Sequence, residues 1–199
     1  MTTFTVNVLF RVGDTANLNG QGVRLALAKG HVQPGETPKF WATAGIFEEN
    51  EFIWTDTYGL YASPVPESAA LLMAAQSTLY PAEMGMSYPF VNNVFGSPSA
   101  GQPGTYSMVN DSGHTCEMGL LQQVEANRSK VMGHVATATL ATHMTGTFAP
   151  RETASVLLYK QDSTGDRVYG MPITVMADGA TTVTVHYSAD MNRFMPGSL

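Results

Sequence analysis

The stretch that most constrains the fold is Glu51–Ser63, which reads EFIWTDTYGLYAS. Alternate residues place Phe52, Trp54 and Tyr58 on one face, and aromatic side chains at period two are typical of a buried strand. Asp56 interrupts this apolar face. A carboxylate there must be paired, hydrogen-bonded or reached by solvent. We therefore expect the strand to meet a polar pocket or to lie at a sheet edge.

The same alternation recurs along the chain, most clearly in Thr3–Val12. The 199 residues include 19 Gly and 11 Pro, and only 13% are charged, against about 25% in typical globular proteins. Short alternating segments separated by turn residues are typical of β-sandwiches. We predict an all-β protein: a single-domain antiparallel β-sandwich or jelly roll over residues 1–199, with about ten strands.

Helical propensity is concentrated in Glu67–Tyr80, which is rich in alanine. We predict at most one short helix, around residues 67–79, with a strand as the alternative. The polar segment that begins at Gly13 and ends at Gly22 is interpreted as a loop, because Gly and Asn recur in it.

Two pairs of neighbouring segments are expected to form hairpins. Lys39–Phe47 and Phe52–Tyr61 are separated only by a short polar turn. Val168–Met176 and Thr181–Ser188 are separated by the Asp178-Gly179 pair, and Asp-Gly between alternating strands is a strong hairpin signal.

Charge and targeting signals limit the class of partner. The net charge is −6, and four Lys and six Arg are scattered along the chain, whereas nucleic-acid binding needs a clustered basic surface. The N-terminus lacks the features of a signal peptide. No apolar run approaches the ~20 residues of a membrane span. We expect a cytoplasmic protein that binds no nucleic acid and does not span a membrane.

Motifs for catalysis and metal binding are missing from the sequence. There is no G-x-S-x-G elbow, phosphate-binding loop or H-E-x-x-H motif. His114 and Cys116 would share one strand face, but the remaining histidines fit no zinc spacing. We interpret Cys116 as a buried structural thiol and expect no catalytic residues, no metal and no enzymatic activity. A hydrolase would need carboxylates such as Asp56 and Glu117 to line one pocket.

The aromatic residues suggest a binding site. Large aromatic side chains and twelve Met suit the lining of an apolar cavity or subunit seam. We predict a small apolar or aromatic ligand, with pigments and chromophores as candidates. Asp56 would provide a polar anchor, and Lys39 could form a Schiff base with an aldehyde-bearing ligand. The predicted ligand-binding residues are Trp41, Trp54, Asp56, Tyr58, Tyr88, Phe90 and Lys39.

Two alternatives stay open at this point. A lectin of the same architecture would bind a glycan through Asp56 with Trp54 or Tyr58, and through Asn92-Asn93. A self-associating structural or storage protein would be a homo-oligomer, such as a dimer, as the low charge and the Met-containing tail suggest.

Overall fold

The stretch Glu51–Ser63 lies within one long strand, β4 (Glu49–Pro64), as the alternation predicts. A computed structural model of the protein describes residues 1–30, 32, 39–65, 76–162, 165–176 and 179–199. Phe52, Trp54 and Tyr58 are buried. Asp56 is half-buried, and its carboxylate has no hydrogen bond or ion pair with another described residue. Solvent therefore reaches this carboxylate, one of the three situations expected for it.

The described residues form an all-β protein, as predicted, with sixteen strands and one helix, α1 (Val12–Gly20). This is more strands than expected, because the irregular middle of the chain contributes several short ones. Besides β4, the strands are β1 (Thr3–Leu9), β2 (Val23–Lys29), β3 (Phe40–Ala44), β5 (Ser77–Leu79), β6 (Met86–Val91), β7 (Val94–Phe95), β8 (Ser99–Ala100), β9 (Tyr106–Asn110), β10 (Cys116–Ala126), β11 (Ser129–Leu140), β12 (Thr145–Phe148), β13 (Ala154–Asp162), β14 (Gly165–Val175), β15 (Thr182–Ser188) and β16 (Arg193–Pro196).

The chain divides into two compact units. Unit 1 consists of Met1–Asp56, Gln123–Gly133 and Arg151–Leu199, and unit 2 consists of Thr57–Gln122 and His134–Pro150. Strands β4, β10 and β11 contribute residues to both units. The single domain over residues 1–199 stays a prediction.

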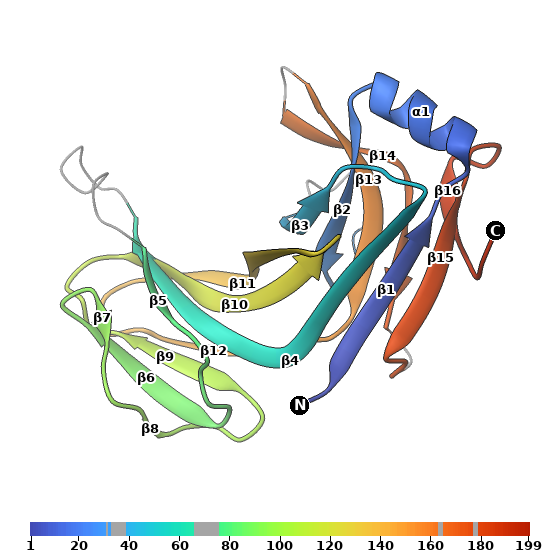
Figure 1. The fold of residues 1–199 in the computed structure, drawn as a ribbon. Helices are drawn as coiled ribbons and strands as arrows, with labels where there is room; N and C mark the ends of the chain where they lie inside the picture. Colours follow the sequence, from blue (N-terminus) through green and yellow to red (C-terminus); the bar gives the residue numbers. More distant parts are fainter. Residues whose placement is uncertain (31, 33–38, 66–75, 163–164, 177–178) are drawn as a thin grey trace. The chain divides into compact units, whose positions relative to one another are not determined.

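The sheet of unit 1 has the strand order β11-β10-β4-β1-β15-β16-β14-β13-β2-β3. β1 pairs with β4 in antiparallel orientation but with β15 in parallel orientation, and β14 and β16 are also parallel. The expected antiparallel sheet is therefore mixed. Figure 1 shows β4, β1 and β15 side by side, so that β1, near the beginning of the chain, has β15, near its end, as a neighbour.

The two edges of this sheet approach each other at Gly133. A Cβ atom on Gly133 of β11 would lie 2.1 Å from the carbonyl oxygen of Trp41 on β3, and 2.6 Å from its Cδ1 atom. Only glycine allows this approach, so the sheet of unit 1 curls back on itself until its edges almost meet. On the outer face of β2, Ala26 and Ala28 pack with Leu157 and Tyr159 in a separate buried cluster.

Unit 2 is a two-layer sandwich, the architecture that the sequence predicts. Its parts of β11, β10 and β4, with β5 beside β4, form one layer, and the other layer has the order β12-β9-β6-β7 with β8 beside β6. Buried side chains fill the space between the layers. They include Tyr58, Leu60, Tyr88, Phe90, Tyr106, Met108, Cys116, Met118 and Leu120.

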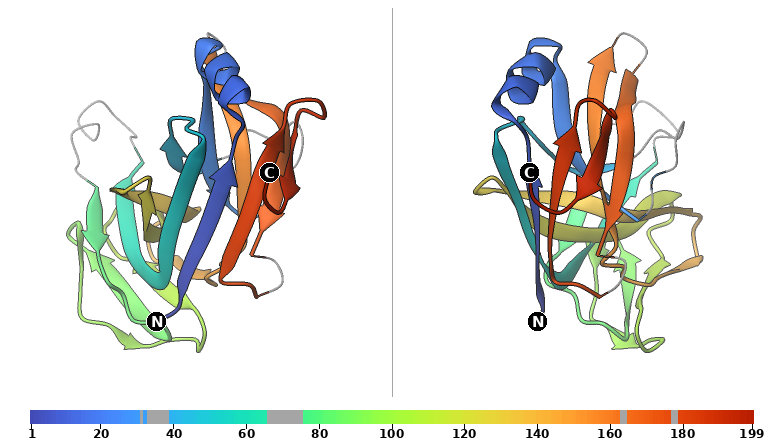
Figure 2. Two further views of the ribbon diagram at one scale, coloured as in Figure 1. Left: turned by 45° about the vertical axis from the view of Figure 1, so that its right-hand side comes forward. Right: turned by 90° about the vertical axis from the view of Figure 1, so that its right-hand side faces the viewer.

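Helix α1 occupies a segment for which a loop was expected. Asp14 lies in its first turn, where a carboxylate is favourable, and Leu18 is buried. The Asn19 side chain donates a 2.8 Å hydrogen bond to the carbonyl of Ile46. Tertiary contacts therefore stabilise a helix that its weak propensity does not indicate. Figure 2 shows α1 across the end of the unit 1 strands in both views.

The helix predicted around residues 67–79 falls largely outside the described residues, and its last part, Ser77–Leu79, is strand β5. Both expected hairpins are wrong. β3 pairs with β2, and β4 pairs with β1, while β16 lies between β14 and β15. Proximity in sequence does not decide these pairings, because burial of whole strand faces outweighs a local turn signal.

Across the part of the chain that the structure describes, no helix combines the length and the apolar character of a membrane span.

Candidate functional site

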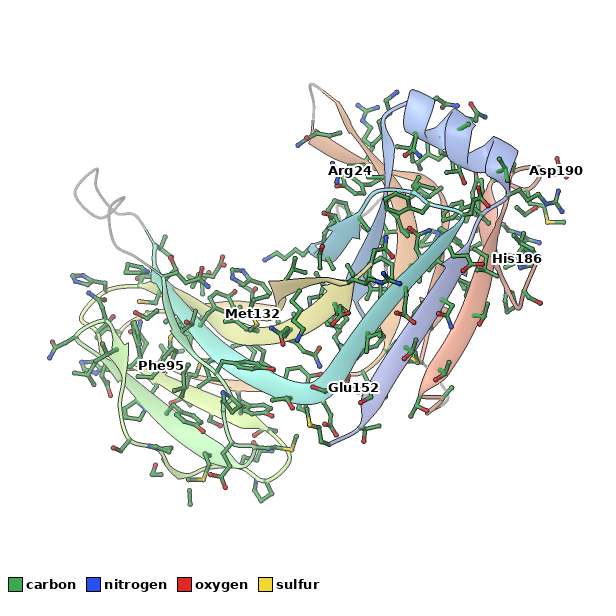
Figure 3. The ribbon with its side chains drawn as sticks, in the orientation of Figure 1. Arg24, Phe95, Met132, Glu152, His186 and Asp190 are labelled. Carbon is green, nitrogen blue, oxygen red and sulfur yellow. The ribbon has the colours of Figure 1, made fainter. Side chains whose placement is uncertain are left out.

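Three strands of unit 1 form a polar floor on the outer face of the sheet. In β1, alternation directs Val6 and Val8 into the core and leaves Asn7 half-buried on the opposite face. The register pairs Asn7 with Glu51 of β4 on one side and with Thr184 of β15 on the other. Paired residues of adjacent strands point to the same face, so these three side chains form one row. Figure 3 labels His186, which lies two residues beyond Thr184 on β15.

The β10–β11 turn forms one rim of this floor. Asn127 and Arg128 both have positive φ, 48° and 68°, as a tight two-residue hairpin turn requires. The backbone N–H of Asn127 donates to the carbonyl of Glu51 at 2.9 Å, and its Oδ1 accepts from the N–H of Glu51 at 2.8 Å. The turn is thus attached to the start of β4 and places the Arg128 side chain beside the floor.

Asn50 fixes a second part of the rim, beside Asn127. It is only 2% exposed, and its amide donates to the carbonyl of Phe47 at 2.7 Å and accepts from the N–H of Phe47 at 3.2 Å. Asn127 Nδ2 also donates to Asn50 Oδ1, at 3.0 Å. A buried amide with its hydrogen bonds satisfied gives a rigid connection. Phe47 itself remains 57% exposed.

Floor and rims enclose an open hollow of about 760 Å³, which we call the Phe47 hollow. Arg128 has no ion pair with another described residue. The hollow combines an accessible aromatic ring with several hydrogen-bonding side chains, and can therefore hold a polar ligand that also has an apolar face. Its lining residues are Asn7, Leu9, Phe47, Glu49, Asn50, Glu51, Asn127, Arg128 and Thr184.

The structure brings together two of the sequence-predicted binding residues in unit 1. The Trp41 and Trp54 rings lie 5.0 Å apart in an edge-on arrangement, and Phe4 stacks on Trp54 at 5.6 Å. The two tryptophans are 3% and 2% exposed. Lys39, predicted to bind an aldehyde-bearing ligand, is exposed and precedes β3.

A different lysine contacts this aromatic pair. The Nζ atom of Lys29 lies 4.3 Å from the centre of the Trp41 ring and 3.2 Å from Oε2 of Glu152. The Trp54 indole N–H donates to the same carboxylate oxygen at 2.9 Å. Burial lowers the pKa of Lys29 to about 8, although the charge of Glu152 and its hydrogen bond act in the opposite direction. Figure 3 labels Glu152.

Sequence reasoning missed Lys29, although a signal for it exists. Lys29 follows Leu25 and Leu27 at period two on β2, so alternation places its side chain on the inward face.

Asp56 also belongs to unit 1, whereas the three remaining predicted binding residues belong to unit 2. Tyr58, Tyr88 and Phe90 lie in the buried cluster between its two layers, where the Tyr58 and Tyr106 rings are 5.7 Å apart. The seven predicted residues are therefore divided between the units, and none of them lines the Phe47 hollow.

A polar cluster on β4, β10 and β11 of unit 2 surrounds Tyr61. Its ring stacks on His134 with centroids 3.9 Å apart, and its hydroxyl contacts Thr137 at 2.6 Å and Glu117 at 3.2 Å. Burial raises the pKa of Tyr61 to about 12. The phenol is therefore neutral at physiological pH and cannot act as a base there. Gly119 leaves room for the ring, because a Cβ atom there would lie 2.8 Å from it.

Cys116 is fully buried, and its thiol contacts the Ser112 hydroxyl at 3.3 Å and the backbone carbonyl of His114 at 3.7 Å, not the imidazole ring. Among the described residues, no group of three or more His, Cys, Asp or Glu could hold a metal ion.

No known protein family, curated protein or solved structure matches this chain.

Proposed function

We propose that this is a non-enzymatic binding protein and that its Phe47 hollow takes a neutral carbohydrate chain. One observation supports this above all: the exposed ring of Phe47 lies in the same hollow as amide and carboxylate side chains, and the hydrogen bonds of Asn50 and Asn127 fix the backbone around it. A sugar presents hydroxyl groups and an apolar C–H face. The C–H face would stack on the aromatic ring, and the hydroxyl groups would bond to the amides and carboxylates.

The polar floor suits a ligand with successive hydroxyl groups. Asn7, Glu51 and Thr184 come from three adjacent strands, which in sheets lie about 4.8 Å apart. An amide, a carboxylate and a hydroxyl in one row offer both donors and acceptors. A ligand lying across the strands would meet all three.

The charges around the hollow favour a neutral ligand over an anionic one. Glu49 and Glu51 contribute two carboxylates and Arg128 one guanidinium, and the whole chain carries a net charge of −6. The excess of carboxylates in the hollow and the negative net charge of the whole chain both repel a sialylated or sulfated glycan. We therefore expect neutral oligosaccharides to bind more tightly than anionic ones of the same size.

An apolar or aldehyde-bearing ligand between the indole rings stays a prediction, and so does a homo-oligomer. The small exposed fractions of Trp41 and Trp54 offer such a ligand little ring surface, which is why we prefer the Phe47 hollow. Native mass spectrometry of the purified protein would detect both a retained compound and a stable dimer.

A glycan array followed by calorimetry tests the carbohydrate proposal. For the best neutral ligand, Phe47→Ala should weaken binding about tenfold, the equivalent of ~1.4 kcal/mol, because the stacking surface is lost. Phe47→Trp should retain binding. Val94→Ala, at a position 61% exposed in unit 2, serves as the control and should bind as the wild type does. An array without a hit, or undiminished binding by Phe47→Ala, would remove the proposal.

A further inference from the structure

A second, smaller hollow lies between α1 and the β15–β16 connection of unit 1, separate from the Phe47 hollow. Its volume of about 270 Å³ is below the roughly 300–1,000 Å³ of pockets for drug-sized ligands, so it suits a small molecule. Figure 3 labels Asp190 in this connection, beside α1. We call it the Asp14 hollow; it is lined by Asp14, Asn17, Leu18, Tyr169, Tyr187, Ala189 and Asn192.

Asn192 is held in a defined orientation inside this hollow. Its Oδ1 accepts a 2.8 Å hydrogen bond from the Tyr187 hydroxyl, and its carbonyl accepts from the N–H of Met171 at 3.0 Å. A Cβ atom on Gly170 would lie 2.6 Å from that carbonyl oxygen and 2.7 Å from Oδ1, so glycine is required there. With Oδ1 engaged, the Nδ2 group of Asn192 has no partner among the described residues.

Asp14 makes the hollow electronegative. Its carboxylate is half-buried and has no ion pair or hydrogen bond with any other residue that the structure describes. Burial, then Tyr169 and then Asp14 raise the pKa of the Tyr187 hydroxyl, so the field of this carboxylate extends across the hollow. The Tyr187 ring packs against Phe10 and Phe194, so only its hydroxyl end faces the hollow. The half-buried Tyr169 also lines the hollow.

We propose that the Asp14 hollow binds a small organic cation of the alkylammonium class. A partly desolvated carboxylate attracts a positive charge, and the half-buried ring of Tyr169 would attract a cation through its π face. The amide groups of Asn17 and Asn192 would donate hydrogen bonds to a hydroxyl on the same ligand. An anion would be repelled by Asp14, and a neutral molecule would leave that carboxylate without a counter-charge.

Choline and its uncharged isostere 3,3-dimethyl-1-butanol provide a direct test, because they share shape and hydroxyl group but differ in charge. In an NMR titration at constant chloride concentration, choline should shift the side-chain amide signals of Asn17 and Asn192 saturably. The affinity of the isostere should be lower than that of choline by a factor of about five or more. Asp14→Asn should weaken choline binding to the level of the isostere.

Asp190→Asn is the matched control, since Asp190 is an exposed carboxylate in the same connection that does not line the hollow. It should leave choline binding within twofold of the wild type. Folding of each variant is checked by its amide spectrum before titration. Equal affinity for choline and its isostere, equal weakening by both Asp variants, or the absence of saturable shifts would each overturn the proposal.

Discussion

The ammonium group of Lys29 lies between two indole rings and the carboxylate of Glu152, and this position determines how the charge contributes to stability. Its pKa is about 8 in the folded protein against an ordinary value of 10.5. Between these values the unfolded chain binds more protons than the folded one, so stability rises with pH. Below pH 8 the full cost of burying the charge is present.

This predicts that the free energy of unfolding rises from pH 8 to pH 10.5 by up to roughly 3 kcal/mol more in the wild type than in Lys29→Met. Urea titrations followed by tryptophan emission measure it, because Trp41 and Trp54 both contact the Lys29 ammonium group. Parallel pH profiles for the two proteins would contradict the prediction.

At the scale of elements, the contact between β11 and β3 depends on Gly133. A methyl group there would clash with the backbone of Trp41 at 2.1 Å, and backbone cannot move away as a flexible side chain can. Gly133→Ala should therefore lower the free energy of unfolding by about 2–3 kcal/mol and change the tryptophan emission. Thermal and urea denaturation measure the effect.

Gly13→Ala is the control for this substitution. Gly13 lies in α1, and a Cβ atom there would have nothing within 4 Å. Since alanine favours a helix over glycine by up to about 1 kcal/mol, this variant should be as stable as the wild type or slightly more stable. If Gly133→Ala behaved in the same way, the edges of the unit 1 sheet would not depend on that glycine.

Elements differ in how far local sequence predicts them. β1, β4 and β14 follow from alternation, because period two depends only on the backbone of a strand. Helix α1 does not follow from its sequence, because buried Leu18 and the bond from Asn19 to Ile46 stabilise it from outside the helix. The partner of β3 was predicted wrongly for the same kind of reason: long-range burial, not the nearest turn, selects it.

At the scale of the whole molecule, β4, β10 and β11 each continue from one unit into the other. When one unit unfolds, these three strands lose their pairing partners in that unit, and the same strands also form part of the other unit. We therefore expect one cooperative transition, in agreement with the predicted single domain. Tryptophan emission, which reports on unit 1 alone, and far-UV circular dichroism, which reports on both units, should give the same midpoint. Two separated midpoints would show that the units unfold independently.

From its sequence alone, this chain could be assigned to the all-β class, several of its strands could be placed, and the inward faces of those strands could be identified. These properties depend on the spacing of residues along a single strand. The two hollows could not be found in this way. The Phe47 hollow combines Asn7, Glu51, Asn127 and Thr184 from four separate segments, and the parallel pairing of β1 with β15 joins the two ends of the chain. Only the tertiary structure decides such neighbours, because register and pairing are set by the burial of whole faces across the sheet.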